Sequence, residues 1–229
     1  MRSLLALVAA AAGLVTGCVL DAVVDRVPQR EPVRPAVRCQ FPATSKARFV
    51  HVACAALFAA AALRFGWSSA LPAWLVLFAA LLAISVIDLE HYIVPNRILI
   101  PLTAAAVPLL ALAVIGDDGD LADFVRGLLG GVAGLTAMLV LNLISPRGMG
   151  MGDVKMSFVL GLYLGFLGWG EVVLGFFAAF LLGALVGLLL IALKRRGRKD
   201  AVPFGPFLAA GTVVAALWGE PILRWYSGA

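Results

Sequence analysis

Charged side chains are scarce in this 229-residue sequence. Asp, Glu, Lys and Arg make up 14% of the residues, whereas hydrophobic residues make up 62% and the mean hydropathy is +1.02. A soluble domain usually has about 25% charged residues and about 45–50% apolar ones. The composition therefore excludes an ordinary soluble domain and predicts a membrane protein.

Cysteine and histidine are also few, and their spacing excludes several kinds of site. Cys18, Cys39 and Cys54 are odd in number and contain no CxxC pair, so neither a disulfide framework nor a zinc site is predicted. His51 and His91 lie 40 residues apart with no HExxH helix, which argues against a metalloprotease. No GxSxG sequence supports a serine hydrolase.

Apolar runs fill most of the chain. A helix needs roughly 17 to 25 apolar residues to cross the hydrocarbon layer. Eight such runs are present, at about residues 4–24, 49–65, 71–87, 98–115, 124–144, 156–169, 171–193 and 203–222. Because the polar segments between them are short, we expect an all-α bundle of about eight transmembrane helices in a single membrane domain, residues 1–229, with a short basic loop at 25–48.

The first apolar run could also be read as a secretory signal. It begins with Arg2, continues through an apolar core and reaches VTGC, which resembles the lipobox before a lipidated cysteine. The apolar run nevertheless continues to about Val24, which is long enough to span the membrane. We therefore interpret it as the first transmembrane helix.

Basic residues are sorted to one side of these spans. Most of the 18 Lys and Arg residues follow an odd-numbered run: Arg26, Arg30, Arg34, Arg38, Lys46, Arg48, Arg97, Arg147, Lys155, Lys194, Arg195, Arg196, Arg198 and Lys199. Since Lys and Arg concentrate in short cytoplasmic loops, both termini should face outward in a multi-pass plasma (inner) membrane protein. The net charge of +5 then reflects topology and contact with membrane lipid, so no nucleic-acid partner is expected.

Two carboxylates lie at the ends of apolar runs and at matching depth. Asp88 closes the third run in AISVIDLEHYIVPNRI, and Asp153 opens the sixth in GMGMGDVKMSF. A charge at the bilayer centre costs about 2.5 to 3.5 kcal/mol on insertion scales and less near the interface, so each carboxylate needs a reason. The alternative is an ordinary interfacial charge, with Asp153 capping the sixth helix.

Breaks in helical structure flank both carboxylates. Gly148, Gly150 and Gly152 lack side chains and would let a second chain, such as a substrate backbone, approach closely. In the other loop, Pro95 removes a backbone donor and Asn96 could cap the fourth helix. Irregular backbone at membrane depth is tolerated where it lines a wet cavity, and hydrolysis needs such a cavity.

A pair of carboxylates can supply an acid and a base together. Two carboxylates within hydrogen-bonding distance tend to share one proton and to titrate as a coupled pair. The ionised member can activate water, and the protonated member can hydrogen-bond a scissile carbonyl, as in aspartic proteases. No metal is required for this chemistry.

Four stretches, in order along the chain, resemble one family. GMGDVK, which contains Gly150, Gly152 and Asp153, resembles the GxGD motif of aspartic intramembrane proteases, in the form found in type IV prepilin peptidases. The other three stretches resemble the first-helix, first-aspartate and last-helix motifs of that family: GCVLDAVVDRVP at 17–28, IDLEHYIVPNRI at 87–98 and VPFGPFLAAG at 202–211.

The resemblance implies an aspartic endopeptidase with Asp88 and Asp153 as its catalytic pair. Its substrates would be prepilins or pseudopilins of a type IV pilus or protein secretion system, cut after a basic leader at the cytoplasmic face. Lys155 would support Asp153, although snorkelling to the headgroups explains it equally well. In the last-helix motif, three residues would either border the active site or simply start a helix: Pro203, Gly205 and Pro206.

The chain also departs from the family pattern. Many members carry two CxxC pairs, a zinc site, after the first helix and methylate the new N-terminus with S-adenosylmethionine. Here the loop at 25–48 holds only Cys39, so zinc is not expected, methyl transfer stays open, and proteolysis itself implies no cofactor. Asp21 and Asp25 replace the usual Asn and His and could pair with Arg26, join the substrate groove or be merely interfacial.

A second class of function is a small proton- or ion-coupled transporter, because intramembrane carboxylates also carry protons or bind cations. No convincing internal repeat supports it.

The remaining polar and small residues have simpler interpretations. His51 is predicted to be an interfacial side chain, and Glu90 and His91 to be solvated loop residues. Four glycine pairs are predicted to mediate close helix packing: Gly127/Gly131, Gly130/Gly134, Gly161/Gly165 and Gly183/Gly187.

Overall fold

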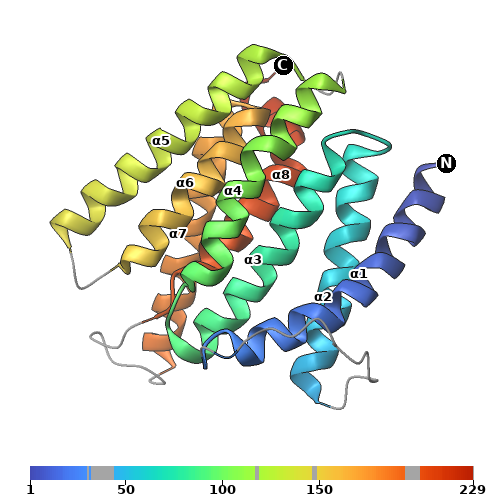
Figure 1. Ribbon diagram of the computed structural model, residues 1–229. Helices are drawn as coiled ribbons and strands as arrows, with labels where there is room; N and C mark the ends of the chain where they lie inside the picture. Colours follow the sequence, from blue (N-terminus) through green and yellow to red (C-terminus); the bar gives the residue numbers. More distant parts are fainter. Residues whose placement is uncertain (30, 32–43, 117–118, 146–148, 194–201, 229) are drawn as a thin grey trace. The chain divides into compact units, whose positions relative to one another are not determined.

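A computed structural model describes residues 1–29, 31, 44–116, 119–145, 149–193 and 202–228 (Figure 1). These described residues form helices and loops without a strand. The helices are α1 (Arg2–Arg26), α2 (Ser45–Phe65), α3 (Leu71–His91), α4 (Asn96–Ile115), α5 (Leu121–Ile144), α6 (Met151–Leu167), α7 (Trp169–Ala192) and α8 (Gly205–Ser227). The prediction of an all-α fold with about eight helices is confirmed.

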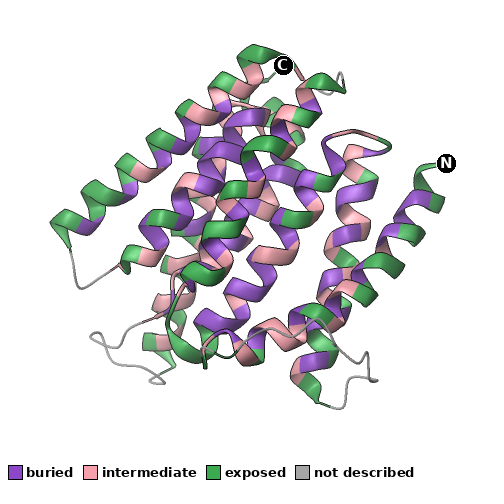
Figure 2. Ribbon diagram, in the orientation of Figure 1, coloured by how far each residue is buried: buried purple, intermediate pink, exposed green. Residues whose placement is uncertain are grey.

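Seven of these helices are long and apolar enough to cross a membrane, and α6, with 17 residues, is the exception. Large apolar side chains also remain exposed, including Leu4 and Leu7 on α1 and Leu129 and Leu143 on α5. Figure 2 shows such exposed positions recurring along both helices. Lipid is the solvent that makes such surfaces favourable, so this is a multi-pass membrane protein.

The chain is organised into two compact units. The first unit consists of residues 1–87 and 95–120, and the second of residues 88–94 and 121–229. The chain therefore enters the second unit at the last turn of α3, leaves it before α4 and returns at α5. That all 229 residues form one functional domain stays a prediction.

Within the first unit, α1 and α2 pack closely through small residues. A Cβ atom added to Gly13 would lie 2.7 Å from Cα of Ala55, and one added to Gly17 would lie 2.8 Å from Cα of His51. Neither position tolerates a side chain, because backbone atoms stand opposite. The two helices therefore touch along their main chains.

The same contact buries His51. This side chain is only 8% exposed, its Nδ1 lies 2.7 Å from the Ala47 carbonyl, and its ring lies against Gly17. The side chain is therefore buried in the contact between α1 and α2, and its place at the membrane interface stays a prediction. Because Gly17 has no side chain, α1 leaves room for an imidazole that would otherwise point toward lipid or water.

Within the second unit, glycines bring α5 and α6 together. A Cβ atom added to Gly130 would lie 2.5 Å from the Gly161 carbonyl oxygen, and one added to Gly127 would lie 2.9 Å from that of Leu162. This confirms the packing role of the Gly127/Gly131, Gly130/Gly134 and Gly161/Gly165 pairs. The prediction is wrong for Gly187, where an added Cβ would meet nothing within 4 Å.

Arg126 on α5 completes the C-terminal end of α6. Its Nε donates to the Gly165 carbonyl over 2.8 Å, and its Nη2 donates to the carbonyls of Phe166 and Leu167 over 2.8 and 3.2 Å. Nη2 also pairs with Asp123 over 2.6 Å. The last carbonyls of a helix have no intrahelical donor, so this single guanidinium satisfies three of them.

Candidate active site

The first carboxylate of the candidate site belongs to the last turn of α3. Asp88 is 4% exposed, and its Oδ2 accepts a hydrogen bond of 3.0 Å from the backbone N–H of Gly205. Gly205 is the first residue of α8, after the N-cap Phe204. The first N–H groups of a helix have no intrahelical acceptor, so the start of α8 has a donor to offer a buried carboxylate.

Because Gly205 has no side chain, it also makes room for the carboxyl group of Asp88. A Cβ atom on Gly205 would lie 2.8 Å from Oδ2 of Asp88 and 3.3 Å from its Cγ. Pro203 is buried just before the helix, and Pro206 follows Gly205 within the first turn. The segment is therefore a helix start, as one interpretation predicted, and it also contacts Asp88. That it borders an active site stays a prediction.

The backbone turns sharply just after Asp88. Tyr92 has φ 57°, in the left-handed region, and its N–H donates to the Asp88 carbonyl over 2.9 Å. Left-handed backbone costs a residue with a side chain about 1–2 kcal/mol. Glu90 and His91, predicted to be loop residues, are exposed in the last turn of α3, since the helix continues past the apolar run.

The second carboxylate lies in the first turn of α6. Asp153 is 6% exposed, and its Oδ2 accepts a hydrogen bond of 3.2 Å from the backbone N–H of Gly150, the N-cap residue. The capping interpretation of Asp153 thus accounts for one oxygen. Its Oδ1 is buried and has no hydrogen-bond partner among the described residues, which leaves an acceptor for a reacting group.

Asp88 and Asp153 belong to the same unit and are close enough for an electrostatic interaction between their carboxyl groups. Across the described part of the chain, neither forms an ion pair with a basic side chain. Two buried carboxylates that interact without a cation resist double ionisation and favour one shared proton. That Asp88 and Asp153 act as acid and base in hydrolysis stays a prediction.

Gly152 brings the segment after Asp88 against α6. A Cβ atom on Gly152 would lie 2.7 Å from Cβ of Val94. The close approach that the glycines predicted is therefore made by the protein's own chain at this position. Gly150 has φ −73° and ψ 147°, an extended conformation open to any residue.

Asn142 is a positioning residue that the sequence analysis missed. This residue of α5 is 9% exposed, and its Nδ2 donates to the Met149 carbonyl over 2.8 Å. The bond fixes the backbone immediately before the N-cap of α6, and hence the turn that carries Asp153. An asparagine inside an apolar helix was the available signal, since buried polar side chains need partners.

The sequence is similar to those of known proteins. Residues 75–188 match the type IV leader peptidase family. The chain belongs to this family. That matched range contains both candidate carboxylates, Gly150, Gly152 and Asn142, whereas Gly205 lies beyond it.

Several curated relatives are called prepilin leader peptidase/N-methyltransferase. The chain is 36% identical to the one from Bacillus subtilis over 75% of its own length and 66% of the relative's. It is 32% identical to the relative from Aeromonas hydrophila, over 82% of its own length and 63% of the relative's. It is also 32% identical to the relative from Pseudomonas aeruginosa, over 77% of its own length and 60% of the relative's. The chain thus spans somewhat less than two thirds of these relatives. No solved structure gives a significant match.

Family membership displaces the transporter alternative, since the relatives are named as leader peptidases. The site roles predicted for Lys155 and Pro95 stay predictions. Lys155 is exposed on α6. Pro95 is buried and is the N-cap of α4, in the first unit.

The prediction that Asn96 caps α4 is wrong. Asn96 is the first helical residue, whereas Pro95 has φ −75° and ψ 122° and takes the N-cap position. The pyrrolidine ring fixes φ near −65°, and a proline at the N-cap loses no helical hydrogen bond, so proline suits this place.

The acidic residues of the first-helix motif have separate environments. Asp25 pairs with Lys46 over 2.7 Å rather than with Arg26, and both side chains are partly exposed. Asp21 is half-buried on α1.

A metal site is not found in the described part of the chain, where no group of three or more His, Cys, Asp and Glu side chains could hold an ion. Cys39 lies outside the described residues.

Proposed function

We propose that this protein is a membrane aspartic endopeptidase that removes the leader peptide from prepilins or prepilin-like proteins. The observation that carries the proposal is the pair of buried, interacting carboxylates, Asp88 and Asp153, in which Oδ1 of Asp153 has no hydrogen-bond partner among the residues that the structure describes. The relatives' names supply the substrate class. Substrates of this class belong to type IV pili and related secretion systems.

In the proposed mechanism, the two carboxyl groups hold one proton between them. The ionised group accepts a proton from a water molecule, which attacks the scissile carbonyl carbon. The protonated group donates a hydrogen bond to the carbonyl oxygen and later supplies the proton that the leaving amine needs. Gly205 N–H and Gly150 N–H each hold one carboxylate oxygen, which keeps both groups oriented throughout.

We place the reaction at the cytoplasmic face of the inner membrane. The support is the sorting of the basic residues, which puts the ends of α3 and the start of α6 on the Lys- and Arg-rich side. On this topology the leader is cut where it leaves the membrane. Membrane lipid surrounds the enzyme, and no nucleic acid takes part.

The test is cleavage of a synthetic prepilin by the purified full-length protein in lipid vesicles, with mass analysis of the product. We expect the wild type to release the leader. Asp88→Asn and Asp153→Asn should each lower the cleavage rate by at least about 100-fold. Each substitution replaces one of the two carboxyl groups, which act as acid and base, by an amide that can do neither. Glu220→Gln, which changes a part-exposed carboxylate on α8, is the matched control and should retain activity.

The same experiment decides between the remaining options. Full cleavage by either single aspartate variant, with its helical content unchanged, would refute the assignment. Addition of S-adenosylmethionine tests the second activity in the relatives' names. A product heavier by one methylene group in its presence would demonstrate methyl transfer, whereas an unchanged mass would leave a peptidase alone.

A further inference from the structure

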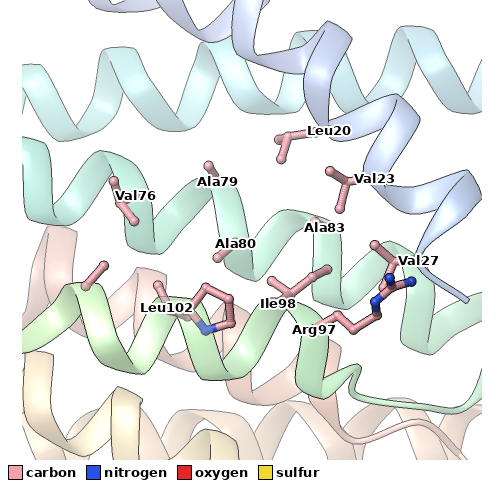
Figure 3. Close-up of a pocket in the computed structure, with 12 residues that line it drawn as sticks. Leu20, Val23, Val27, Val76, Ala79, Ala80, Ala83, Arg97, Ile98 and Leu102 are labelled. Carbon is pink, nitrogen blue, oxygen red and sulfur yellow. The ribbon is translucent and has the colours of Figure 1, made fainter. Parts of the chain in front are cut away.

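An apolar groove crosses the surface of the first unit. Its volume is about 460 Å³, and it is bounded by α1, α3 and α4 (Figure 3). Eleven of its lining residues are apolar and one is charged: Leu20, Val23, Val27, Val76, Ala79, Ala80, Ala83, Ile98, Pro101, Leu102 and Ala105, with Arg97. A groove with this lining suits a hydrocarbon chain.

The groove covers one leaflet rather than the whole membrane. Val27 and Arg97 lie toward one end in Figure 3, and Val76 lies toward the other. From Arg97 to Ala105, α4 rises about 12 Å, whereas half of the hydrocarbon layer is about 15 Å thick. A transmembrane helix of a protein partner would need a groove through both leaflets, whereas one acyl chain needs only this length.

Arg97 places a positive charge where a lipid headgroup would lie. It is exposed in the first turn of α4, and its Nη1 donates to the Glu31 carbonyl over 3.1 Å. Guanidinium has five N–H donors, and no other acceptor for Arg97 is found among the described residues. The remaining donors match the oxygens of a phosphate, which guanidinium groups bind in a bidentate manner.

We propose that this groove is a binding site for one anionic phospholipid of the leaflet in which α4 begins. An acyl chain lies against the alanines of α3, and the phosphate lies on Arg97. The charge and the length of the groove together select this occupant over a neutral lipid or a spanning helix. The proposal is independent of peptidase activity.

The test measures lipid binding by the full-length protein in mild detergent, using native mass spectrometry. The probes are phosphatidylglycerol and phosphatidylcholine with the same acyl chains. We expect the wild type to prefer phosphatidylglycerol by about 10-fold or more, the scale of a charge-assisted hydrogen bond. Arg97→Gln should abolish the preference, and Arg97→Lys should keep part of it because the charge remains.

A control and a second measurement guard the result. Arg48→Gln removes an exposed charge of α2 that does not line the groove, and should leave the preference unchanged. A photo-reactive side chain at Ala80 should cross-link to lipid in native membranes. Equal retention of both lipids by the wild type, or an unchanged preference in Arg97→Gln, would overturn the proposal, as would cross-linking only to a protein.

Discussion

The backbone N–H of Gly205 donates a 3.0 Å hydrogen bond to Oδ2 of Asp88, although the two residues are 117 positions apart in sequence. The bond joins the last turn of α3 to the first turn of α8. It gives a buried carboxylate a fixed direction without a basic side chain.

Gly205→Ala should reduce cleavage strongly without unfolding the protein. The added Cβ would lie 2.8 Å from Oδ2 of Asp88, so the carboxylate must move away from its donor. Loss of a hydrogen bond to a charged group corresponds to about 1.5–3 kcal/mol, or roughly 10- to 100-fold in rate. Initial rates on a synthetic prepilin measure this effect. Gly187→Ala, whose added Cβ meets nothing within 4 Å, should cleave normally.

Asn142→Leu should lower the cleavage rate by about 5-fold, with little loss of stability. The substitution keeps the branched shape of the side chain but removes the 2.8 Å hydrogen bond to the Met149 carbonyl. A buried hydrogen bond contributes about 1 kcal/mol. The turn before Asp153 would then lose its fixed position. Thr103→Val, which removes a 2.8 Å bond to the Leu99 carbonyl within α4, is the control. Equal rates in both variants would contradict a positioning role for Asn142.

Gly161→Ala should lower the thermal unfolding temperature in detergent. Its added Cβ would clash with the Gly130 carbonyl and lie 3.0 Å from Cα of Gly131, so α5 and α6 would have to separate. Overpacking of this kind costs about 1–3 kcal/mol. Gly187→Ala should instead stabilise slightly, since alanine is favoured over glycine in a helix by about 1 kcal/mol. A higher unfolding temperature for Gly161→Ala would contradict the packing described for these helices.

Arg126→Ala should destabilise the second unit far more than Arg224→Ala. Arg126 satisfies three carbonyls at the end of α6, and leaving such groups unpaired costs about 1–3 kcal/mol. Arg224 forms one exposed pair with Glu220, worth about 0–1 kcal/mol. Chemical unfolding followed by circular dichroism compares the two variants. Similar midpoints would show that the cap contributes little.

The helices could be predicted from the sequence because hydrocarbon demands long apolar runs. The ends of the helices were predicted less accurately. The third run was read to Ile87, yet α3 continues to His91, since a helix can extend beyond the hydrocarbon with polar residues. Pro95 took the cap position expected for Asn96 because its fixed φ suits a helix start.

The candidate carboxylates were also predictable, since unexplained acidic residues are rare in apolar sequence. Their partners were not. Both hydrogen bonds to Asp88 and Asp153 come from backbone N–H groups of glycines, and a backbone donor carries no signature in side-chain chemistry. The burial of His51 depends on Gly17 of another helix, and the contact at Gly152 depends on Val94, so both required the tertiary arrangement.

Dependence of Asp88 on α8 has a consequence during biosynthesis. A ribosome makes α3 and α6 well before residues 205–227, so a partly inserted nascent chain already carries both acids but lacks the Gly205 donor. Since loss of that hydrogen bond corresponds to about 1.5–3 kcal/mol, the unfinished polypeptide should cleave roughly 10- to 100-fold more slowly than the complete one. Synthesis of α8 therefore supplies the last of the described contacts around Asp88.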